Sequence, residues 1–162
     1  MDLIPITNYP NYSLDKNTNQ VYNTKYNRYL KSHSHSKGYY LIKLYTNNIP
    51  DYFLLHRLIY QVYNPDIDIT NLQIDHIDNN KTNNNIDNLR QCNSSENNCN
   101  KKTTITNKSG FKNISETRYN TYGVQIRKNK IAYYKSFKKL EDAIEWRDLK
   151  LKEIHGNFAN LG

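Results

Sequence analysis

The stretch IDHIDNNKTNNNIDNLRQCNSSENNCN, residues 74–100, decides how the chain is organised. The short run Gln73–His76 ends in a carboxylate and an imidazole, which is typical of a strand with polar groups at its end. Leu89–Cys92 predicts the returning strand. Asn93 and Glu96 have the spacing of a capping box, so a helix begins there. The sequence therefore predicts a strand, a long polar loop, a second strand and a helix.

The polar groups of this stretch suit hydrolysis of a phosphodiester. A hard divalent ion with oxygen ligands neutralises the scissile phosphate and the leaving oxygen. The Asp75 carboxylate and the side-chain carbonyl of Asn97 are two such ligands. A neutral imidazole accepts a proton from water near neutral pH, which is the role expected of His76. The alternative interpretation is a polar loop in an Asn-rich chain.

A longer pattern surrounds these residues. Its members are His56-Arg57-Leu58-Ile59, Asp75-His76-Ile77-Asp78-Asn79-Asn80, Asn83-Asn84, Asn88-Leu89-Arg90 and Glu96-Asn97. The pattern resembles the HNH endonucleases, in particular the homing-type enzymes found in phage introns and large DNA viruses. The resemblance implies that Asp75 and Asn97 are metal ligands for Mg²⁺ or Mn²⁺ and that His76 is the general base. It also implies a catalytic-site role for Asn88, whose side chain pins the loop between the strands.

The two cysteines depart from a pattern that many HNH enzymes carry. Those enzymes hold a structural zinc with two CxxC pairs, whereas Cys92 and Cys99 lack such partners. We expect no structural zinc and interpret both cysteines as small apolar filler. No signal peptide and no long apolar run is evident, so we expect an intracellular protein with free thiols and no membrane partner.

Residues 1–54 predict a strand-rich module. Its best strand covers residues 38–45, and residues 51–54 pair back as a hairpin. His33 and His35 are expected in a polar loop. The next segment, Leu55–Tyr63, has one apolar stripe of helical period, and Asn64-Pro65 ends it. His56 at its start is expected to pack structurally, in preference to a catalytic role.

The last third of the chain predicts a separate unit after a basic linker at residues 101–108. Three strands are expected at residues 111–115, Tyr122–Lys128 and Ile131–Phe137, followed by a helix over Leu140–His155. Gly156 falls where a left-handed helix cap is expected, and Trp146 is expected in the core. Alternation directs Val124 and Ile126 toward the helix and Gln125 and Arg127 toward a partner.

This unit has a resemblance of its own, carried by Ser109–Ile114, Tyr122–Arg127, Ser136-Phe137, the helix and Phe158–Leu161. It is similar to the APETALA-type (ethylene-response-factor-like) DNA-binding domain, which implies a sheet lying in the major groove. The resemblance implies DNA contacts by Lys112, Gln125, Arg127 and Tyr133, and Arg118, Lys128 and Lys130 are expected on phosphates. The alternative interpretation is a small helix-on-sheet unit used for protein contacts.

The bulk composition agrees with a DNA partner. The net charge is +8, and 15 tyrosines dominate the aromatic residues, which suits contact with sugar-phosphate surfaces. The apolar fraction, 36%, indicates small modules in place of one large core.

Together these patterns predict a modular α+β chain. The expected parts are an N-terminal module (1–54), an HNH core of the ββα-metal type (55–100), the linker (101–108) and the DNA-binding domain (109–162). The predicted function is hydrolysis of double-stranded DNA by a metal-dependent, homing-type endonuclease, with no protein partner implied. The main alternative is a DNA-binding protein with an inactive nuclease site, and a nuclease toxin with little sequence preference fits less well.

Overall fold

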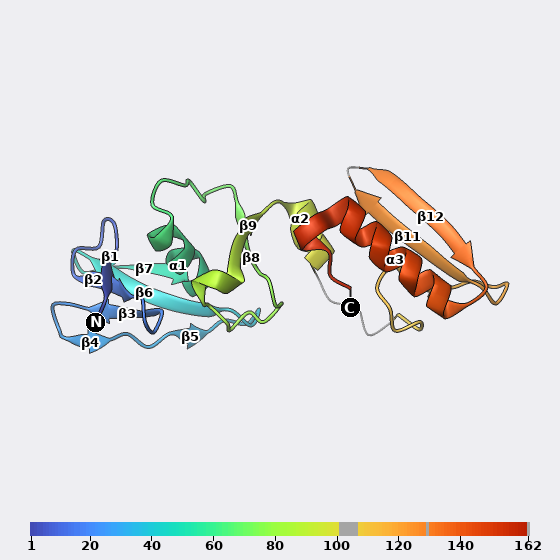
Figure 1. Ribbon diagram of the computed structural model, residues 1–162. Coiled ribbons are helices and arrows are strands. Elements are labelled where there is room, and N and C mark those ends of the chain that lie inside the picture. Colours follow the sequence, from blue (N-terminus) through green and yellow to red (C-terminus); the bar gives the residue numbers. More distant parts are fainter. Residues whose placement is uncertain (101–106, 129, 162) are drawn as a thin grey trace. The chain divides into compact units, whose positions relative to one another are not determined.

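The computed structural model describes residues 1–100, 107–128 and 130–161. Its contacts divide the chain into two compact units, Met1–Cys92 and Asn93–Gly162. Each unit combines antiparallel strands with helices, as predicted for an α+β chain (Figure 1). Residues 101–106 of the predicted linker lie outside the described residues, and the predicted four-part division stays a prediction.

The first unit begins with a four-stranded antiparallel sheet in the order β1-β2-β3-β4. Its strands are β1 (Leu3–Pro5), β2 (Tyr12–Asp15), β3 (Gln20–Asn23) and β4 (Arg28–Tyr29). The connections contain Asn8, Asn19 and Asn27, each with a positive φ. Asn tolerates this left-handed conformation better than most residues, so the Asn-rich sequence supplies the sharp turns.

A second antiparallel sheet has the order β5-β6-β7. Its strands are β5 (His33–Ser34), β6 (Tyr40–Thr46) and β7 (Ile49–Leu54). Asn47 and Asn48 both have positive φ, which suits a two-residue hairpin turn between β6 and β7. The polar loop predicted around His33 is wrong, because backbone pairing of His33 with Leu41 makes it a short edge strand.

Helix α1 (Leu55–Tyr63) begins and ends at the predicted residues and is followed by a second hairpin. That hairpin consists of β8 (Gln73–His76) and β9 (Leu89–Cys92), with a short 3-10 helix, η1 (Ile86–Asn88), before β9. Buried side chains from the N-terminal sheets, α1 and the hairpin form one continuous core. Its members include Leu14, Val21, Ile42, Leu44, Ile59, Ile74 and Leu89. The N-terminal strands and the HNH-like hairpin are therefore stabilised by the same core.

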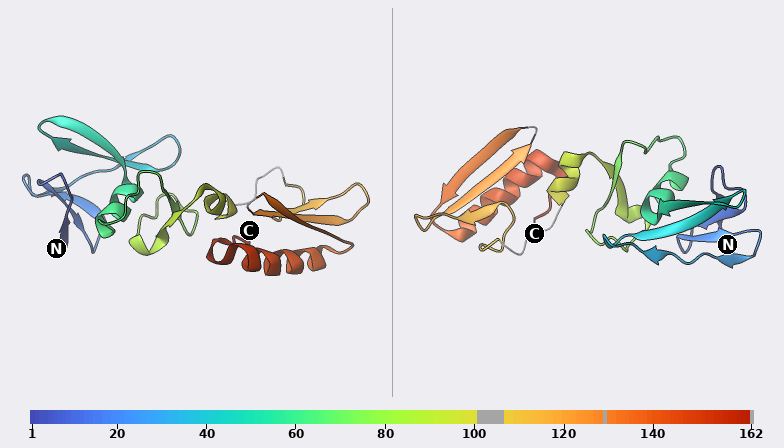
Figure 2. Two further views of the ribbon diagram at one scale, coloured as in Figure 1. Left: turned by 90° about the horizontal axis from the view of Figure 1, so that it is seen from above. Right: turned by 180° about the vertical axis from the view of Figure 1, so that it is seen from behind.

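The second unit opens with α2 (Ser94–Asn100) and continues into a three-stranded antiparallel sheet, β10-β11-β12. The strands are β10 (Ile114–Glu116), β11 (Tyr122–Lys128) and β12 (Ile131–Phe137). Helix α3 (Leu140–His155) lies along one face of this sheet and leads into η2 (Gly156–Phe158) (Figure 2). Gly156 has the predicted positive φ, 52°.

The core of the second unit lies between α3 and the sheet and is separate from the first core. Trp146 packs against it and lies beside Phe137, as predicted. Leu149 of α3 is 63% exposed, whereas Leu151 is buried. The first strand begins at Ile114 and not at residue 111, because Asn113 has a φ of 65° that interrupts extended backbone.

No helix within the described ranges is both long enough and apolar enough to cross a membrane.

Candidate functional site

The end of β8 brings a buried carboxylate and a buried imidazole together. Asp75 is 8% exposed and His76 is 3% exposed. The β8–β9 register places Asp75 opposite Arg90, whose Nε and NH2 atoms donate to Asp75 Oδ2 at 3.2 and 3.1 Å. This ion pair compensates a charge that would be costly to bury alone. Arg90 received no role from the sequence, although antiparallel alignment of the two predicted strands would have placed it there.

The imidazole of His76 is held by an asparagine of the loop. Its Nε2 lies 3.1 Å from Oδ1 of Asn84. An amide oxygen only accepts hydrogen bonds, so Nε2 carries a proton. A general base at this position would use the other ring nitrogen, Nδ1. Asn84 belonged to the sequence pattern, but nothing distinguished its role from those of neighbouring asparagines.

A second histidine packs against His76. The ring centroids of His56 and His76 are 4.9 Å apart, and Tyr39 stacks on His56 at the same distance. Burial lowers the pKa of His56 to about 3, and the charges of His76 and Arg57 act in the same direction. A neutral, buried His56 agrees with the packing role expected from the sequence.

The loop between the strands is fixed by Asn88. Its Oδ1 accepts from the backbone N–H of Asp78 at 3.1 Å. Its Nδ2 donates to Asp78 Oδ1 at 2.9 Å and to the carbonyl of Asn83 at 2.8 Å. The Asn88 side chain thus holds the loop closed by bonding to Asp78, ten residues earlier in the sequence. This is the pinning contact that was expected of Asn88. Its effect on catalysis stays a prediction.

Helix α2 begins with the predicted capping box. The Asn93 N–H donates to Glu96 Oε2, and the Glu96 N–H donates to Asn93 Oδ1, both at 2.9 Å. The first helical bond runs from the N–H of Asn97 to the carbonyl of Asn93. Asn97 belongs to the second unit, whereas Asp75 and His76 belong to the first.

The donor set is therefore thin for a metal. The described residues contain no group of three or more His, Cys, Asp and Glu side chains that could hold an ion. In the first unit the Asp75 carboxylate could supply one hard oxygen ligand of the kind Mg²⁺ prefers. The pairing of Asp75 with Asn97 as ligands stays a prediction.

In the second unit, the sheet has one face turned away from α3. The register pairs Gln125 with Tyr134 and Arg127 with Ala132, so these side chains share that outer face. Val124 and Ile126 are fully buried on the helix side, as the alternation predicted. Gln125 and Arg127 are exposed, so both expected DNA contacts are accessible.

Tyr133 is corrected by this register. It pairs with the buried Ile126, packs against the core, and its ring lies 5.0 Å below the ammonium of Lys150. It therefore faces α3 and not the outer surface. Its neighbour Tyr134 is 62% exposed and approaches Gly123, where an added Cβ would lie 3.0 Å from the Tyr134 hydroxyl. The missing side chain at Gly123 lets the Tyr134 ring lie across the outer face.

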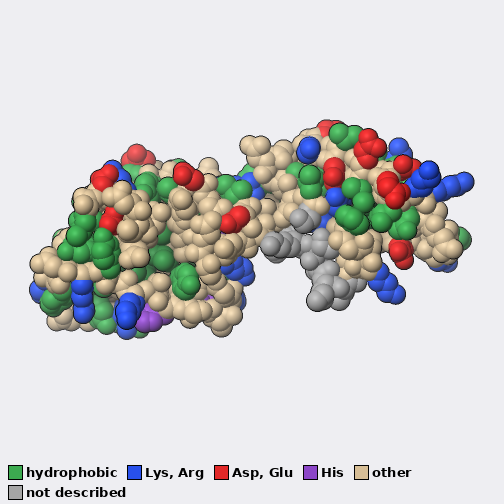
Figure 3. Space-filling model, turned by 60° about the horizontal axis from the view of Figure 1, so that its bottom comes forward, with side chains coloured by type: hydrophobic (Ala, Val, Ile, Leu, Met, Phe, Trp, Pro, Cys, Tyr) green, Lys and Arg blue, Asp and Glu red, His purple; other side chains and the backbone are tan. Residues whose placement is uncertain are grey.

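The residues expected to contact phosphates differ in the contacts they already make within the protein. Arg118 and Lys130 are exposed, and the Arg118 guanidinium lies 4.8 Å from the Tyr119 ring centre. Lys128 donates to the carbonyl of Ile154 near the end of α3, and so has a structural contact as well. Figure 3 shows Lys and Arg interspersed with Asp and Glu on the viewed face of this unit. Charge alone therefore does not identify a DNA-binding face.

Cys92 is buried, as expected of apolar filler, but Cys99 is not simple filler. Its Sγ lies 3.2 Å from Nδ1 of His155 at the end of α3. Burial raises the pKa of the Cys99 thiol, while Lys112 and Lys128 act in the opposite direction. Burial also lowers the pKa of His155, and the same two lysines add to that shift. A neutral thiol therefore faces a neutral imidazole.

Comparison with known proteins finds a family similarity over this region of the chain. Residues 53–99 match the HNH endonuclease family. This HNH segment includes α1, the hairpin and nearly all of α2, so the HNH motif predicted from the sequence is confirmed. The match says nothing of an APETALA-type domain, which stays a prediction.

Curated relatives repeat the same description. Two uncharacterized HNH endonucleases of Acanthamoeba polyphaga mimivirus are 38% identical over 96 residues and 37% identical over 106 residues. These matches cover 58% and 65% of this chain but 28% and 54% of the relatives. The H-N-H endonuclease F-TflII of Escherichia phage T5 is 36% identical over 86 residues, which cover 52% of this chain and 44% of F-TflII. The chain thus spans about half or less of these relatives.

One solved structure resembles the whole fold. It describes DNA binding and cleavage by the HNH homing endonuclease I-HmuI. The similarity has a TM-score of 0.56 at 22% identity and covers 96% of this chain and 91% of that one. The mixed sheet and helix fold therefore resembles that of an HNH homing endonuclease.

Proposed function

We propose that this chain is a metal-dependent HNH endonuclease of the homing type that hydrolyses phosphodiester bonds of double-stranded DNA. The observation that carries the proposal is the buried Asp75–His76 pair at the end of β8, inside the HNH segment, with His76 held by Asn84. A buried imidazole of fixed orientation suits proton transfer in a way that a polar surface loop does not.

His76 would take the proton of the attacking water on Nδ1, while its Nε2–H continues to donate to Asn84 Oδ1. Asp75 and Asn97 would hold Mg²⁺ or Mn²⁺, which supplies positive charge to the scissile phosphate and leaving oxygen. Asn88 would keep the loop from displacing His76 and Asn84. Preorganised groups of this kind need no rearrangement when charge develops.

The second unit would read the DNA sequence, as an APETALA-type domain does. The outer sheet face supports this, because Gln125 and Arg127 are exposed there beside the Tyr134 ring. Arg127 suits guanine and Gln125 suits adenine. Lys112, Arg118, Lys128 and Lys130 would add contacts to the phosphates or the groove edge.

The second candidate function is DNA binding without cleavage. The Asp75–Arg90 ion pair favours it, because a guanidinium occupies the carboxylate that a metal needs. The two candidate functions differ in one respect: an active site would require a divalent ion to displace Arg90 from Asp75, and an inactive site would keep the ion pair.

Incubation of the purified protein with supercoiled plasmid, with Mg²⁺, Mn²⁺ or EDTA, tests the two candidates. We expect nicked or linear DNA with either ion and none with EDTA. Binding without cleavage under every metal condition, on plasmids with varied targets, supports the inactive-site alternative. Affinity should fall with salt at roughly −0.9 in log–log slope for each phosphate neutralised.

A further inference from the structure

The second unit contains a cavity of about 350 Å³ beside its outer sheet face. Three elements enclose it. Its lining residues are Asn98 and Cys99 from α2, Lys112 and Asn113 before β10, Gln125 and Arg127 from β11, and Leu151 and His155 from α3. Every one of these residues belongs to the second unit. This volume lies at the lower end of the range for small-ligand sites. It is larger than the volume that a lone phosphate needs.

Polar groups that lack partners converge on this cavity. Among the described residues, the side chains of Arg127 and Gln125 make no hydrogen bond, and Oδ1 of Asn113 is buried without a partner. The Asn113 amide cannot simply turn away, because its Nδ2 donates to the Gln125 carbonyl at 2.9 Å. A buried acceptor without a donor is costly, so it indicates a ligand that donates to it.

The charge of the lining points to an anionic ligand. Lys112 and Arg127 are cationic, and the eight lining residues include no carboxylate. Lys112 Nζ also donates to the Cys99 carbonyl at this cavity. Glu96 is near enough to influence Cys99, but it does not line the cavity.

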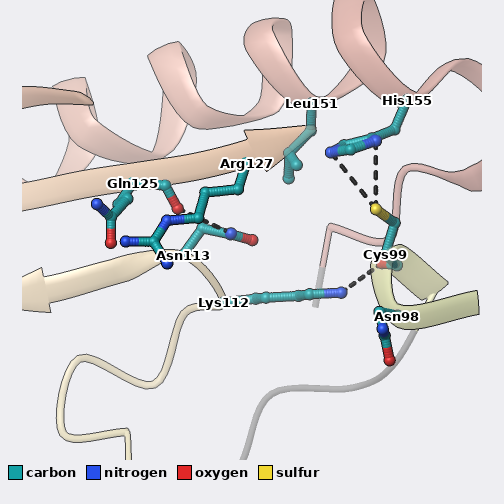
Figure 4. A pocket seen from close by; sticks show the side chains of 8 residues that line it. All are labelled: Asn98, Cys99, Lys112, Asn113, Gln125, Arg127, Leu151 and His155. Carbon is teal, nitrogen blue, oxygen red and sulfur yellow. Dashed lines mark hydrogen bonds between the residues drawn. The ribbon is translucent and has the colours of Figure 1, made fainter. Parts of the chain in front are cut away.

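The two kinds of group are separated in space. Figure 4 shows Gln125, Arg127 and Asn113 toward one side, and the Lys112 ammonium toward the other, beside Cys99. Leu151 and the neutral imidazole of His155 form an apolar, partly aromatic wall. Gln125, Arg127 and Asn113 suit the edge of a base, and Lys112 suits a phosphate. His155 and Leu151 offer aromatic and apolar surface to the ring of a nucleotide.

We propose that this cavity is a binding site for one nucleotide, with the base edge on Gln125, Arg127 and Asn113 and the phosphate on Lys112. The ligand is either an unpaired nucleotide of a DNA strand or a free nucleotide, since both carry the same groups. The DNA form rests on the proposed function, because the strand must already be bound by the chain. Binding of a free nucleotide does not depend on the proposed function. Extruding a base from a duplex costs its pairing and stacking energy, so a site that accepts one favours DNA that is already unpaired.

Cys99 provides a direct measure of occupancy, because its half-exposed thiol lines the cavity whereas Cys92 is buried. The full chain is treated with N-ethylmaleimide, and labelling of each cysteine is followed by peptide mass spectrometry. We expect dGMP to slow labelling of Cys99 with an affinity that calorimetry reproduces, and to leave Cys92 unchanged. Deoxyguanosine and inorganic phosphate should each bind at least tenfold more weakly than dGMP.

Matched variants locate the ligand. Arg127→Gln should weaken dGMP binding about tenfold or more, because it removes a charged donor at an exposed position where folding is not at risk. Lys138→Gln is the control, because Lys138 is an exposed cation of the same unit outside the cavity. Lys112→Gln should weaken dGMP but leave deoxyguanosine binding unchanged.

Two results would overturn the nucleotide site: no protection of Cys99 by dGMP at millimolar concentration, or equal losses from Arg127→Gln and Lys138→Gln. Duplex DNA with one unpaired guanine separates the two sources. Tighter binding of that duplex than of a fully paired one assigns the site to the strand, and equal binding assigns it to the free nucleotide. Binding of dGMP by a chain that neither binds nor cuts DNA would refute the proposed function and leave the site standing.

Discussion

The polar side chains of the two units differ in whether they are hydrogen-bonded within the protein. In the first unit, the side chains near the end of β8 are bonded to one another: Asp75 to Arg90, His76 to Asn84, and Asn88 to the loop. In the second, Arg127 and Gln125 extend from the outer sheet face without side-chain partners among the described residues.

This difference indicates that the first unit is built for catalysis and the second for binding. A bonded network fixes side chains within tenths of an ångström, which proton transfer and metal binding require. Groups without internal partners are suited to a ligand that supplies the missing donors and acceptors, as DNA bases and phosphates do. The comparison predicts that substitutions in the first unit lower the rate of cleavage, whereas substitutions on the outer face of the second lower affinity.

The largest expected effect is that of His76→Ala. Loss of the general base should reduce the single-turnover cleavage rate by about 10²–10⁴-fold, with DNA affinity unchanged. A gel-based cleavage assay at saturating protein measures the rate, and a filter-binding assay measures the affinity. His33→Ala is the matched control, because His33 is an exposed histidine of the same unit. A His76→Ala protein that cuts at the normal rate would show that His76 is not the general base.

Asn88→Ala tests whether the bonded network is needed. The change removes three hydrogen bonds that hold the loop, so we expect a loss of roughly 1–3 kcal/mol in the free energy of unfolding. Cleavage should fall as well, because His76 loses the fixed position of Asn84. Chemical denaturation and the cleavage assay measure the two effects. Asn71→Ala, an exposed asparagine outside the loop, should change neither; equal stability of both variants would contradict the pinning role.

Local patterns were sufficient to predict much of this structure. Helices α1 and α3 and strands β8, β9, β11 and β12 have the predicted bounds, because their apolar periods and end signals lie within a few residues of each other. The capping box of α2 is equally local. The pairing of β8 with β9 then brings Asp75 beside Arg90, which neither strand indicates alone.

The rest depends on contacts between distant residues. The strand register alone decides that Tyr134, and not Tyr133, lies on the outer face. Selection of Asn84 from a run of asparagines requires the folded loop that brings its amide to His76. The early strands share one core with the HNH hairpin, because Leu14 and Ile74 join the same buried cluster only after folding. Composition could not predict that continuity.

The buried His56 predicts a pH effect on the first unit alone. Its pKa is about 3 when folded and about 6.5 when unfolded, so the unfolded state binds the extra proton as the pH falls below 6.5. Stability is therefore lost on acidification, by about 2 kcal/mol at pH 5. His56→Leu should lose that much less stability between pH 7 and pH 5. Hydrogen exchange of α1 peptides measures it, and His33→Leu, at an exposed position, should behave as the unchanged protein does.

The smallest expected effect concerns α2, which carries Asn97. Asn93→Ala removes the side-chain acceptor of the capping box, which costs about 1 kcal/mol of helix stability. Asn93→Asp retains an acceptor oxygen and adds a charge that the helix N-terminus favours, so it should preserve stability. Hydrogen exchange of peptides covering residues 94–100 separates the two variants. If Ala and Asp exchange equally fast, the cap does not hold α2. If only Ala loosens α2 and also slows cleavage, the position of Asn97 matters for catalysis, which is the result that its assignment as a metal ligand requires.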